Sequence, residues 1–272
     1  MNNKNKLSLV LAFLSSLAAL SAQAGPFEVA VSPSRLELVA NTSQRLGQSI
    51  DIQNIGKSPT ELNIRTLDWT YSTEGQITYH DALLPNSCRP WVTLEKSSLK
   101  LNAQAKRSFR FQVQVPANAP RTECRFMVAI EGKDAATNTM LKAGGANLSL
   151  PVNGRIAVAV YVAVGGAEPK LSIKQLNVQN AKGQRVPVVI VSNQGDAHGR
   201  LGGALEAKDA KGQEFELSPE GTPILPGQTR TLPLMPQAFA KQKLNPPAYP
   251  IQAKGNIDWD KGSFKINQAV FK

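Results

Sequence analysis

Residues 147–164 form an alternating stretch that constrains the fold of this chain more than any other feature. Their even-numbered positions are apolar except for Gly154, and their odd-numbered positions are mostly polar or small. A period of two residues is the pattern of a β-strand with one apolar face. At about 3.3 Å per residue such a strand would extend roughly 60 Å, whereas a usual strand has about 5–6 residues. We therefore predict one long strand whose apolar face is too long for a single small sandwich to cover.

The two halves of this stretch differ in composition. From Ile156 onward both faces are apolar or small, which is typical of a strand inside a sheet. In residues 147–153 the other face is polar, and Pro151 has no N–H to donate, so this half is predicted to be an exposed edge strand. It carries Leu148, Leu150 and Val152, and an uncovered apolar edge normally favours aggregation. The stripe is therefore either a surface for another polypeptide or a strand over the protein's own core.

Residues 1–24 have the features of a signal peptide. Lys4 and Lys6 precede the apolar residues 7–20, and Ala22-Gln23-Ala24 is a small-x-small cleavage site. The apolar run is shorter than the ~20 residues of a membrane span, and no later segment of the sequence reaches that length. We expect a mature chain that begins at Gly25, is exported and is soluble. At roughly 100–150 residues per domain, its length predicts two domains.

The two cysteines, Cys88 and Cys124, are expected to form one disulfide, because a single pair in an exported protein most economically pairs with itself. Closing a loop of about 36 residues would stabilise the fold by roughly 3–4 kcal/mol. A metal or redox site would need nearby histidines or a C-x-x-C motif, and the sequence has neither.

The formal net charge is +11, which suits an acidic partner, an anionic membrane surface or simple solubility. No block of five like charges occurs and aromatic residues are sparse, so the sequence gives no support for nucleic-acid binding.

From Phe27 onward, short alternating segments are separated by turn residues. Seven or more of them precede residue 165 and a second series follows, which predicts two antiparallel β-sandwiches, residues 25–165 and 166–272. Pro33, in the first segment, is expected to mark an edge strand that switches sheets. Residues 133–145, polar and small, are interpreted as a loop that leads into the long strand.

Catalytic motifs are lacking in the sequence. There are two histidines, His80 and His198, one in each predicted domain, and no nucleophile elbow, zinc-protease motif, Walker A or dinucleotide fingerprint occurs. The sequence therefore predicts a protein that is not an enzyme and that uses no metal or other cofactor.

Arg35 and Arg155 are the candidate binding residues, because both lie among strongly apolar neighbours. A guanidinium near a crevice between domains is suited to bidentate capture of a carboxylate. The alternative is a pair of surface arginines whose aliphatic stems cover apolar neighbours.

Several short motifs occur in a characteristic order along the mature chain. They are Val31-Ser32-Pro33-Ser34-Arg35-Leu36, Asn54-Ile55-Gly56, Leu67-Asp68-Trp69, Pro90-Trp91-Val92, Val115-Pro116, Arg121 to Phe126, Asn193-x-Gly195-x-x-His198 and Leu225-Pro226-Gly227. In this order and spacing the chain resembles the periplasmic pilus (fimbrial) assembly chaperones of the chaperone–usher pathway, most closely their archaic branch.

The resemblance implies two immunoglobulin-like domains set at an angle, like a boomerang, with a pilus subunit bound along the first domain and in the cleft. The last strand of the first domain would supply the missing strand of the subunit through Leu148, Leu150 and Val152, and an outer-membrane usher would receive the complex. Two basic residues of the cleft would anchor the subunit's C-terminal carboxylate. Arg35 matches the first of them. The second, usually a lysine, aligns with Ala157, and Arg155 lies on the same face two residues earlier.

Two other functions remain open from the sequence. The chain is alternatively an exported adhesin or pilus component, although no sorting signal or lipobox cysteine is seen near residue 25. A carbohydrate-binding sandwich would rely on Trp69, Trp91 and Trp259, whose strand-like contexts instead suggest core positions.

Overall fold

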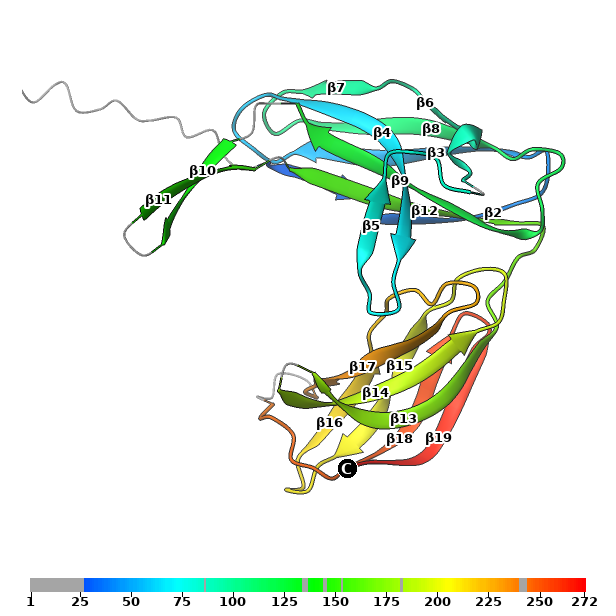
Figure 1. Cartoon of the computed structure of the whole chain (residues 1–272), viewed down its shortest axis with the longest axis vertical. Coiled ribbons are helices and arrows are strands. Elements are labelled where there is room, and N and C mark those ends of the chain that lie inside the picture. The colour runs from blue at the N-terminus through cyan, green and yellow to red at the C-terminus, as the bar shows by residue number, and fades with distance from the viewer. Residues whose placement is uncertain are drawn as a thin grey trace, which may run out of the picture.

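The computed structural model describes residues 27–85, 87–133, 137–143, 146–152, 154–181, 183–239 and 244–272, with the backbone alone for 137–143 and 146–152. The predicted signal peptide, residues 1–24, lies outside them. The described chain folds into β-strands and one short 3₁₀ turn, η1 (Arg89–Trp91). Two β-sandwich domains lie at an angle to each other (Figure 1). The predicted fold class, all-β with two sandwich domains, is confirmed.

The first domain consists of two sheets. One has the strand order β1 (Val29–Ser32), β3 (Arg45–Asn54), β8 (Lys106–Gln114) and β6 (Val92–Leu94). The other has the order β2 (Arg35–Ala40), β12 (Arg155–Val164), β9 (Thr122–Gly132), β4 (Thr60–Tyr71) and β5 (Ile77–His80), and β7 (Ser98–Leu101) also pairs with β4. We call this second sheet the β12 sheet.

The chain changes sheets at Pro33, as the sequence predicted. Before this proline, β1 pairs antiparallel with β3, and after it β2 pairs in parallel with β12. The Ser32–Pro33 peptide bond is cis. This switch brings Arg35, the first residue of β2, onto the same sheet as Arg155, the first residue of β12.

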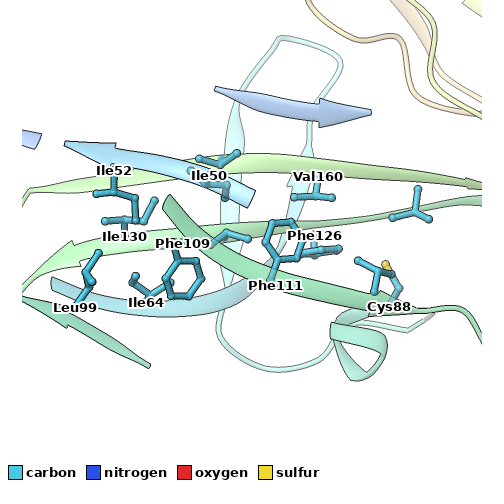
Figure 2. Close-up of a cluster of buried hydrophobic side chains, with 14 of the residues drawn as sticks. Ile50, Ile52, Ile64, Cys88, Leu99, Phe109, Phe111, Phe126, Ile130 and Val160 are labelled. Atoms are coloured by element: carbon cyan, nitrogen blue, oxygen red, sulfur yellow. The ribbon is translucent and has the colours of Figure 1, made fainter. Parts of the chain in front are cut away.

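Alternation within the strands builds the core of the first domain. Every second side chain of each inner strand points between the two sheets, where aromatic rings of β8 and β9 meet β-branched side chains (Figure 2). The labelled residues of this core are Ile50, Ile52, Ile64, Cys88, Leu99, Phe109, Phe111, Phe126, Ile130 and Val160. From Val158 to Val164 the even-numbered residues of β12 are fully buried here, as their pattern predicted.

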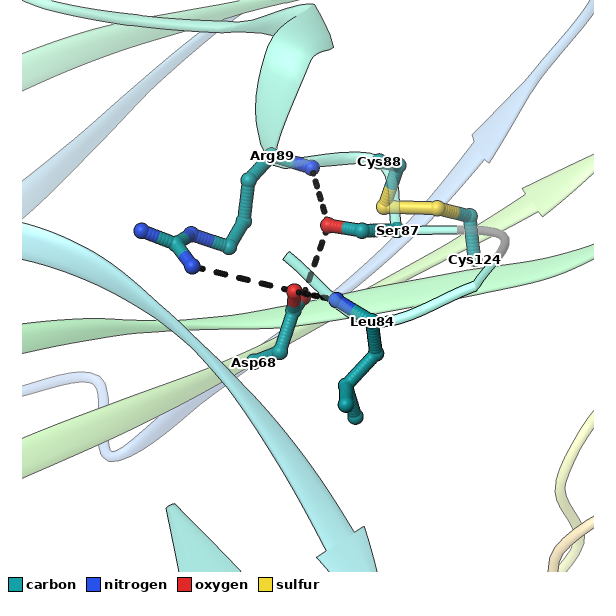
Figure 3. Close-up of a disulfide and its surroundings, with 6 residues drawn as sticks. All are labelled: Asp68, Leu84, Ser87, Cys88, Arg89 and Cys124. Carbon is teal, nitrogen blue, oxygen red and sulfur yellow. Dashed lines mark hydrogen bonds and ion pairs between the residues drawn. A yellow bond between two sulfur atoms is a disulfide. The ribbon is translucent and has the colours of Figure 1, made fainter. Parts of the chain in front are cut away.

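The predicted disulfide between Cys88 and Cys124 is present, with both cysteines buried. Beside it, the buried carboxylate of Asp68 accepts hydrogen bonds from the Leu84 amide (2.9 Å) and the Ser87 hydroxyl (2.8 Å) (Figure 3). The Arg89 guanidinium lies 3.7 Å from the same carboxylate. The disulfide and the Asp68 carboxylate together hold the connection between β5 and η1 against the β12 sheet.

The stretch 147–164 is not one strand, and this prediction was wrong. It divides into β11 (Ala146–Val152) and β12, and the two belong to different sheets. Within the segment that the sequence interpreted as a loop lies β10 (Thr137–Ala143), which pairs antiparallel with β11. In Figure 1 this two-stranded ribbon extends away from the first sandwich.

Gly154 lies where the chain passes from β11 to β12, and its surroundings leave no room for a side chain. A Cβ on Gly154 would lie 2.0 Å from the Cβ and Cγ of Phe27. The Gly154 carbonyl accepts a hydrogen bond from the Gly132 amide (3.2 Å), so the backbone is fixed there. The crossing of Phe27 over this glycine therefore sets the point at which the ribbon leaves the β12 sheet.

The second domain is built from seven strands. Their order is β13 (Leu171–Ala181), β14 (Gln184–Asn193), β17 (Thr229–Gln237), β16 (Glu214–Pro219), β15 (Leu201–Lys208), β18 (Ile251–Trp259) and β19 (Gly262–Phe271). The strand β17 pairs with β14 through residues 229–233 and with β16 through residues 234–237. It therefore links the two layers, which enclose a separate core centred on Phe215, Leu205 and Phe271.

The two domains are held together by a third buried cluster on the face of the β12 sheet opposite to the first core. It contains Leu67, Trp69, Tyr71, Met127, Ala129 and Tyr161 from the first domain and Leu225 from the second. The turn between β4 and β5 adds polar contacts, because the Gln228 side chain donates to the Tyr71 carbonyl (2.8 Å) and the buried Arg230 lies over the Tyr71 ring. Apolar burial and these bonds together fix the angle between the domains.

The close contact at Gly154 predicts the effect of adding one methyl group there. Gly154→Ala is expected to lower the free energy of unfolding by about 1–3 kcal/mol, because the Phe27 ring has to shift to accommodate the new Cβ. Urea denaturation would measure the change. Gly47→Ala in β3 is the matched control, since a Cβ there meets no atom within 4 Å. Equal stability of the two variants would contradict the role given to Gly154.

Candidate functional site

The β10–β11 ribbon is the first part of the candidate site. Thr139 pairs with Leu150 and Leu141 with Leu148, and within the described residues neither strand pairs with any other. The predicted anchor residues Leu148, Leu150 and Val152 occupy alternate positions of β11, while their side chains lie outside what the structure describes. The far edge of β11 is therefore a row of backbone groups to which a further strand can add.

The second part is the face of the β12 sheet that is turned away from the first core. On β12 it carries the odd-numbered residues, from Arg155 through Ala157 and Ala159 to Tyr161. Arg35 pairs with Ala159 and Glu37 with Tyr161, so the start of β2 contributes charged groups to the same face. Both predicted arginines thus lie on one surface.

Arg155 is held by a carboxylate of its own domain. Its Nε lies 2.5 Å from Glu131 on the neighbouring strand, and its guanidinium lies 5.7 Å from the centre of the Tyr79 ring. Arg65 donates two hydrogen bonds to the same carboxylate, from Nε (2.9 Å) and Nη2 (3.0 Å). These bonds from Arg65 hold the pKa of Glu131 below its ordinary value, and the charges of Arg65 and Arg155 act in the same direction.

Arg35 lies elsewhere on the surface and is not adjacent to Arg155. Because Arg35 pairs with Ala159, four residues beyond Arg155, the two arginines are roughly 13 Å apart along the strand direction. Arg35 is about half exposed and its Nε donates to Glu37 (2.8 Å). The structure therefore does not join the two predicted anchor residues into one carboxylate site. Ala157, which aligns with the usual lysine, packs against the interdomain cluster.

The structure adds a polar corner between the domains that the sequence did not indicate. The buried Glu123 accepts hydrogen bonds from the amide (3.0 Å) and Nδ1 (2.5 Å) of His198, whose ring stacks on Tyr161 at 4.0 Å. Arg200 donates to the Tyr161 hydroxyl (3.3 Å). Burial raises the pKa of Tyr161. We call Arg35, Glu37, Glu123, Tyr161, His198 and Arg200 the interdomain corner.

Arg125 lies next to this corner and completes the charged face. Its guanidinium lies 5.4 Å from the centre of the Trp69 ring, and its buried Nε has no hydrogen-bond partner. Burial lowers the pKa of Arg125 from its ordinary value, and the charge of Glu123 opposes that change. This side of the β12 sheet thus holds positive charge that is only partly paired.

The alternating pattern would have placed Glu37 beside Arg35, because both are odd-numbered residues of one strand. No sequence signal places His198 and Arg200 there, because they come from the other domain.

Groups that would hold a metal are not found among the described residues, which contain no cluster of three or more His, Cys, Asp or Glu side chains. In the same residues no helix is long and apolar enough to cross a membrane. The open edge of β11, the apolar cluster and the arginines of the β12 sheet are suited to strand pairing, apolar contact and recognition of acidic groups.

Comparison with solved structures finds chaperones of pili and fimbriae. The YadV chaperone shares 11% identity with a TM-score of 0.46, over 89% of this chain and 99% of its own. The class 5 fimbriae chaperone CfaA shares 13% identity with a TM-score of 0.46, over 90% and 99%. CsuC was solved with CsuE, the tip subunit of the archaic Csu pili of Acinetobacter baumannii. It shares 16% identity with a TM-score of 0.42, over 89% of this chain and 97% of its own.

No protein-family model matches the chain, and no curated protein matches it in sequence. The sequence identities and TM-scores of these solved structures show a related fold and do not assign the chain to a family.

The lowered pKa of Glu131 predicts a pH-dependent contribution to stability. A carboxylate whose pKa is lowered by folding stabilises the fold above its unfolded pKa of about 4.3, and this contribution is lost as the pH falls through the folded pKa. Glu131→Gln should therefore lower the free energy of unfolding by about 1–2 kcal/mol near pH 7, and by much less near pH 2.5.

Urea denaturation at the two pH values would measure this difference. Glu214→Gln is the control, because Glu214 and its partner Lys208 are both more than half exposed. A Glu131→Gln effect of the same size at both pH values would contradict the assignment.

Proposed function

We propose that this protein is a periplasmic chaperone that binds and stabilises pilus subunits by donor-strand complementation. In this proposal β11 adds to the incomplete sheet of a subunit, and the interdomain face receives another part of it. The chaperone then delivers the subunit to an outer-membrane usher. The ordered motifs favour the archaic branch of these chaperones, and the predicted signal peptide favours the periplasm.

The observation that carries the proposal is the open edge of the β10–β11 ribbon. Among the described residues β11 pairs with β10 alone, and the ribbon extends away from both sandwiches (Figure 1). Soluble proteins normally protect an edge of this kind because it can pair with other chains. A strand with an open edge and apolar residues at alternate positions is suited to adding itself to the sheet of another protein.

Energetics support a role for both the backbone and the side chains of β11. Each new hydrogen bond between β11 and a subunit strand is worth about 1 kcal/mol net. Burial of Leu148, Leu150 and Val152 in the subunit adds roughly 1.5–3 kcal/mol for each side chain, before the cost of ordering the ribbon is subtracted. The apolar residues therefore supply much of the affinity, and the basic residues of the interdomain face orient the subunit.

The alternative proposal is an exported adhesin or pilus component. Such a protein would stay with the cell surface or the fibre, whereas a chaperone remains in the soluble periplasmic fraction. Fractionation of the cells that make the protein separates these two functions.

Leu150→Asp tests the role of β11 directly. A buried aspartate costs several kcal/mol without a partner, so the variant should recover at least 10-fold less subunit than the unmodified protein. The measurement is affinity purification from periplasm followed by mass spectrometry of the small β-rich proteins that accompany it.

Met235→Asp is the matched control, because Met235 is an exposed apolar residue of the second domain. It should recover normal amounts of subunit, and both variants should unfold at the temperature of the unmodified protein. Normal recovery by Leu150→Asp would contradict the proposal.

A further inference from the structure

We infer that Asn193 sets the angle between the two domains, because its side chain ties the linker between them to two segments that contact the first domain. Asn54 is its counterpart in the first domain, where the same bonds serve that domain alone. Asn193 is thus a positioning residue, which acts through the segments that it binds. This role concerns the free protein and does not depend on the proposed function.

Asn193, the last residue of β14, is 1% exposed and uses both ends of its side-chain amide. Its Oδ1 accepts hydrogen bonds from the amides of Lys170 (3.0 Å) and Gly195 (2.9 Å). Its Nδ2 donates to the carbonyls of Ala197 (2.8 Å) and Ile224 (2.8 Å). These four bonds satisfy the whole side chain. One residue therefore joins the linker, the turn after β14 and the loop before β17.

The turn and the loop both contact the first domain. In the turn, the Asp196 carbonyl accepts a hydrogen bond from the Glu123 amide (2.8 Å), and the Asp196 carboxylate binds Arg121 (2.7 Å). In the loop, Leu225 lies in the interdomain cluster, and the Gln228 side chain donates to a carbonyl of the first domain. The placement of the first domain thus follows from the spacing of the turn and the loop, which Asn193 fixes.

The linker is packed on the turn with no space for a side chain. A Cβ on Gly195 would overlap the Glu168 carbonyl and lie 2.5 Å from the Lys170 nitrogen. The Asp196 amide donates to the Glu168 carbonyl (3.1 Å), and the Gln194 amide donates to the Lys170 carbonyl (2.9 Å). The path by which the chain enters the second domain is therefore set at the same point.

Asn54, the last residue of β3, makes an equivalent set of bonds in the first domain and is 2% exposed. Its Oδ1 accepts from the amide of Gly56 (2.9 Å), two residues further along. Its Nδ2 donates to the carbonyl of Ser58 (2.7 Å), four residues further along, and to that of Asn102 (3.0 Å) in the loop before β8. The spacings of two and four residues are those found at Asn193.

The loops that receive the two asparagines are also alike. Residues 102–105 and 225–228 each form a turn in which the fourth amide donates to the first carbonyl, at 3.1 Å and 3.0 Å. The third residue has a positive φ in both turns, 60° at Gln104 and 77° at Gly227. Each asparagine amide donates to the carbonyl of the fourth residue of its turn (2.9 Å in both). The Asn-x-Gly motif therefore marks the same structural position in both domains.

The surroundings of the two asparagines differ. The groups bound by the Asn54 side chain belong to the first domain, and beside them the Ile55 amide donates to the Glu28 carbonyl of the same domain (2.9 Å). The Ile55 side chain is 51% exposed. The chain thus offers a matched pair of buried asparagines, and the pair with the domain junction beside it is that of Asn193 and its turn.

The first experiment compares Asn193→Asp with Asn54→Asp by residual dipolar couplings of the backbone amides. Each substitution removes the Nδ2 donor and places a carboxylate against two carbonyl oxygens, so both should lower the unfolding temperature by a similar amount. Asn193→Asp should also change the orientation of the second domain relative to the first, while the couplings within each domain still fit. An unchanged orientation in Asn193→Asp, or an equal change in Asn54→Asp, would overturn the inference.

Gly195→Ala and Gly56→Ala repeat the comparison without a buried charge, so that a variant that fails to fold does not leave the question open. The new Cβ overlaps the linker backbone at Gly195, whereas at Gly56 it overlaps the movable side chain of Glu28. Gly195→Ala should rotate the second domain and Gly56→Ala should not. The same orientation in both variants would contradict the role of the turn that Asn193 holds.

A second measurement relates the angle to the proposed function. Asn193→Asp should recover several-fold less subunit from periplasm than Asn54→Asp, because the two domains no longer present the interdomain face in one arrangement. A changed orientation with normal recovery would confirm the role of Asn193 and contradict the part that the proposed function gives to that face.

Discussion

The structure depends on β12 being paired along both edges and buried along its even-numbered face. It is hydrogen-bonded to β2 on one edge and β9 on the other, its even-numbered residues lie in the first core, and Tyr161 and the alanines pack in the interdomain cluster. A strand held in this way cannot move without disturbing both domains. The ribbon that precedes it is therefore attached to a strand that is paired on both edges, although the ribbon itself pairs with no described strand of either sandwich.

The same strand joins the two parts of the candidate site. Along the chain from β11 to β12, backbone edge groups are followed by basic residues and then by the interdomain corner. In the proposed function, a polypeptide that pairs with β11 and continues toward the second domain would pass over the face with Arg155 and Arg35. The angle between the domains decides whether Arg200 and His198 can reach it. The contacts of Gln228 and Arg230 with the β4–β5 turn help to hold that angle.

Local sequence patterns predicted the parts of the fold that depend on a single strand, a single proline or a single pair of cysteines. The alternation from Ile156 to Val164, the sheet switch at Pro33 and the pairing of Cys88 with Cys124 follow from period, ring geometry and composition, and the structure has all three. The end of β11 and the start of β12 on either side of Gly154 could not be predicted from the sequence. Val152 and Ile156 are both even-numbered apolar residues, so the alternating pattern continues across Gly154. Only the contact with Phe27 shows why the chain changes direction there. In the same way TNTMLKA, the sequence of β10, lacks the alternation that would mark a strand.

The candidate site was predictable only in part, because its charges come from both domains. Arg35 and Arg155 were found through their apolar neighbours, but the distance between them follows from the parallel register of β2 and β12. Arg200 and His198 have no local signal, since their relation to Glu37 exists only after the domains pack together.

The central claim is that β11 becomes a strand in the sheet of another protein, and hydrogen exchange of its backbone amides tests this most directly. In the free protein the amides of residues 146–152 on the open edge should exchange rapidly, while those of β12 are protected. Binding of a subunit should slow exchange in 146–152 by at least 10-fold and leave β12 nearly unchanged. Unchanged exchange in 146–152 on a chain that is fully bound to its subunit would contradict the account.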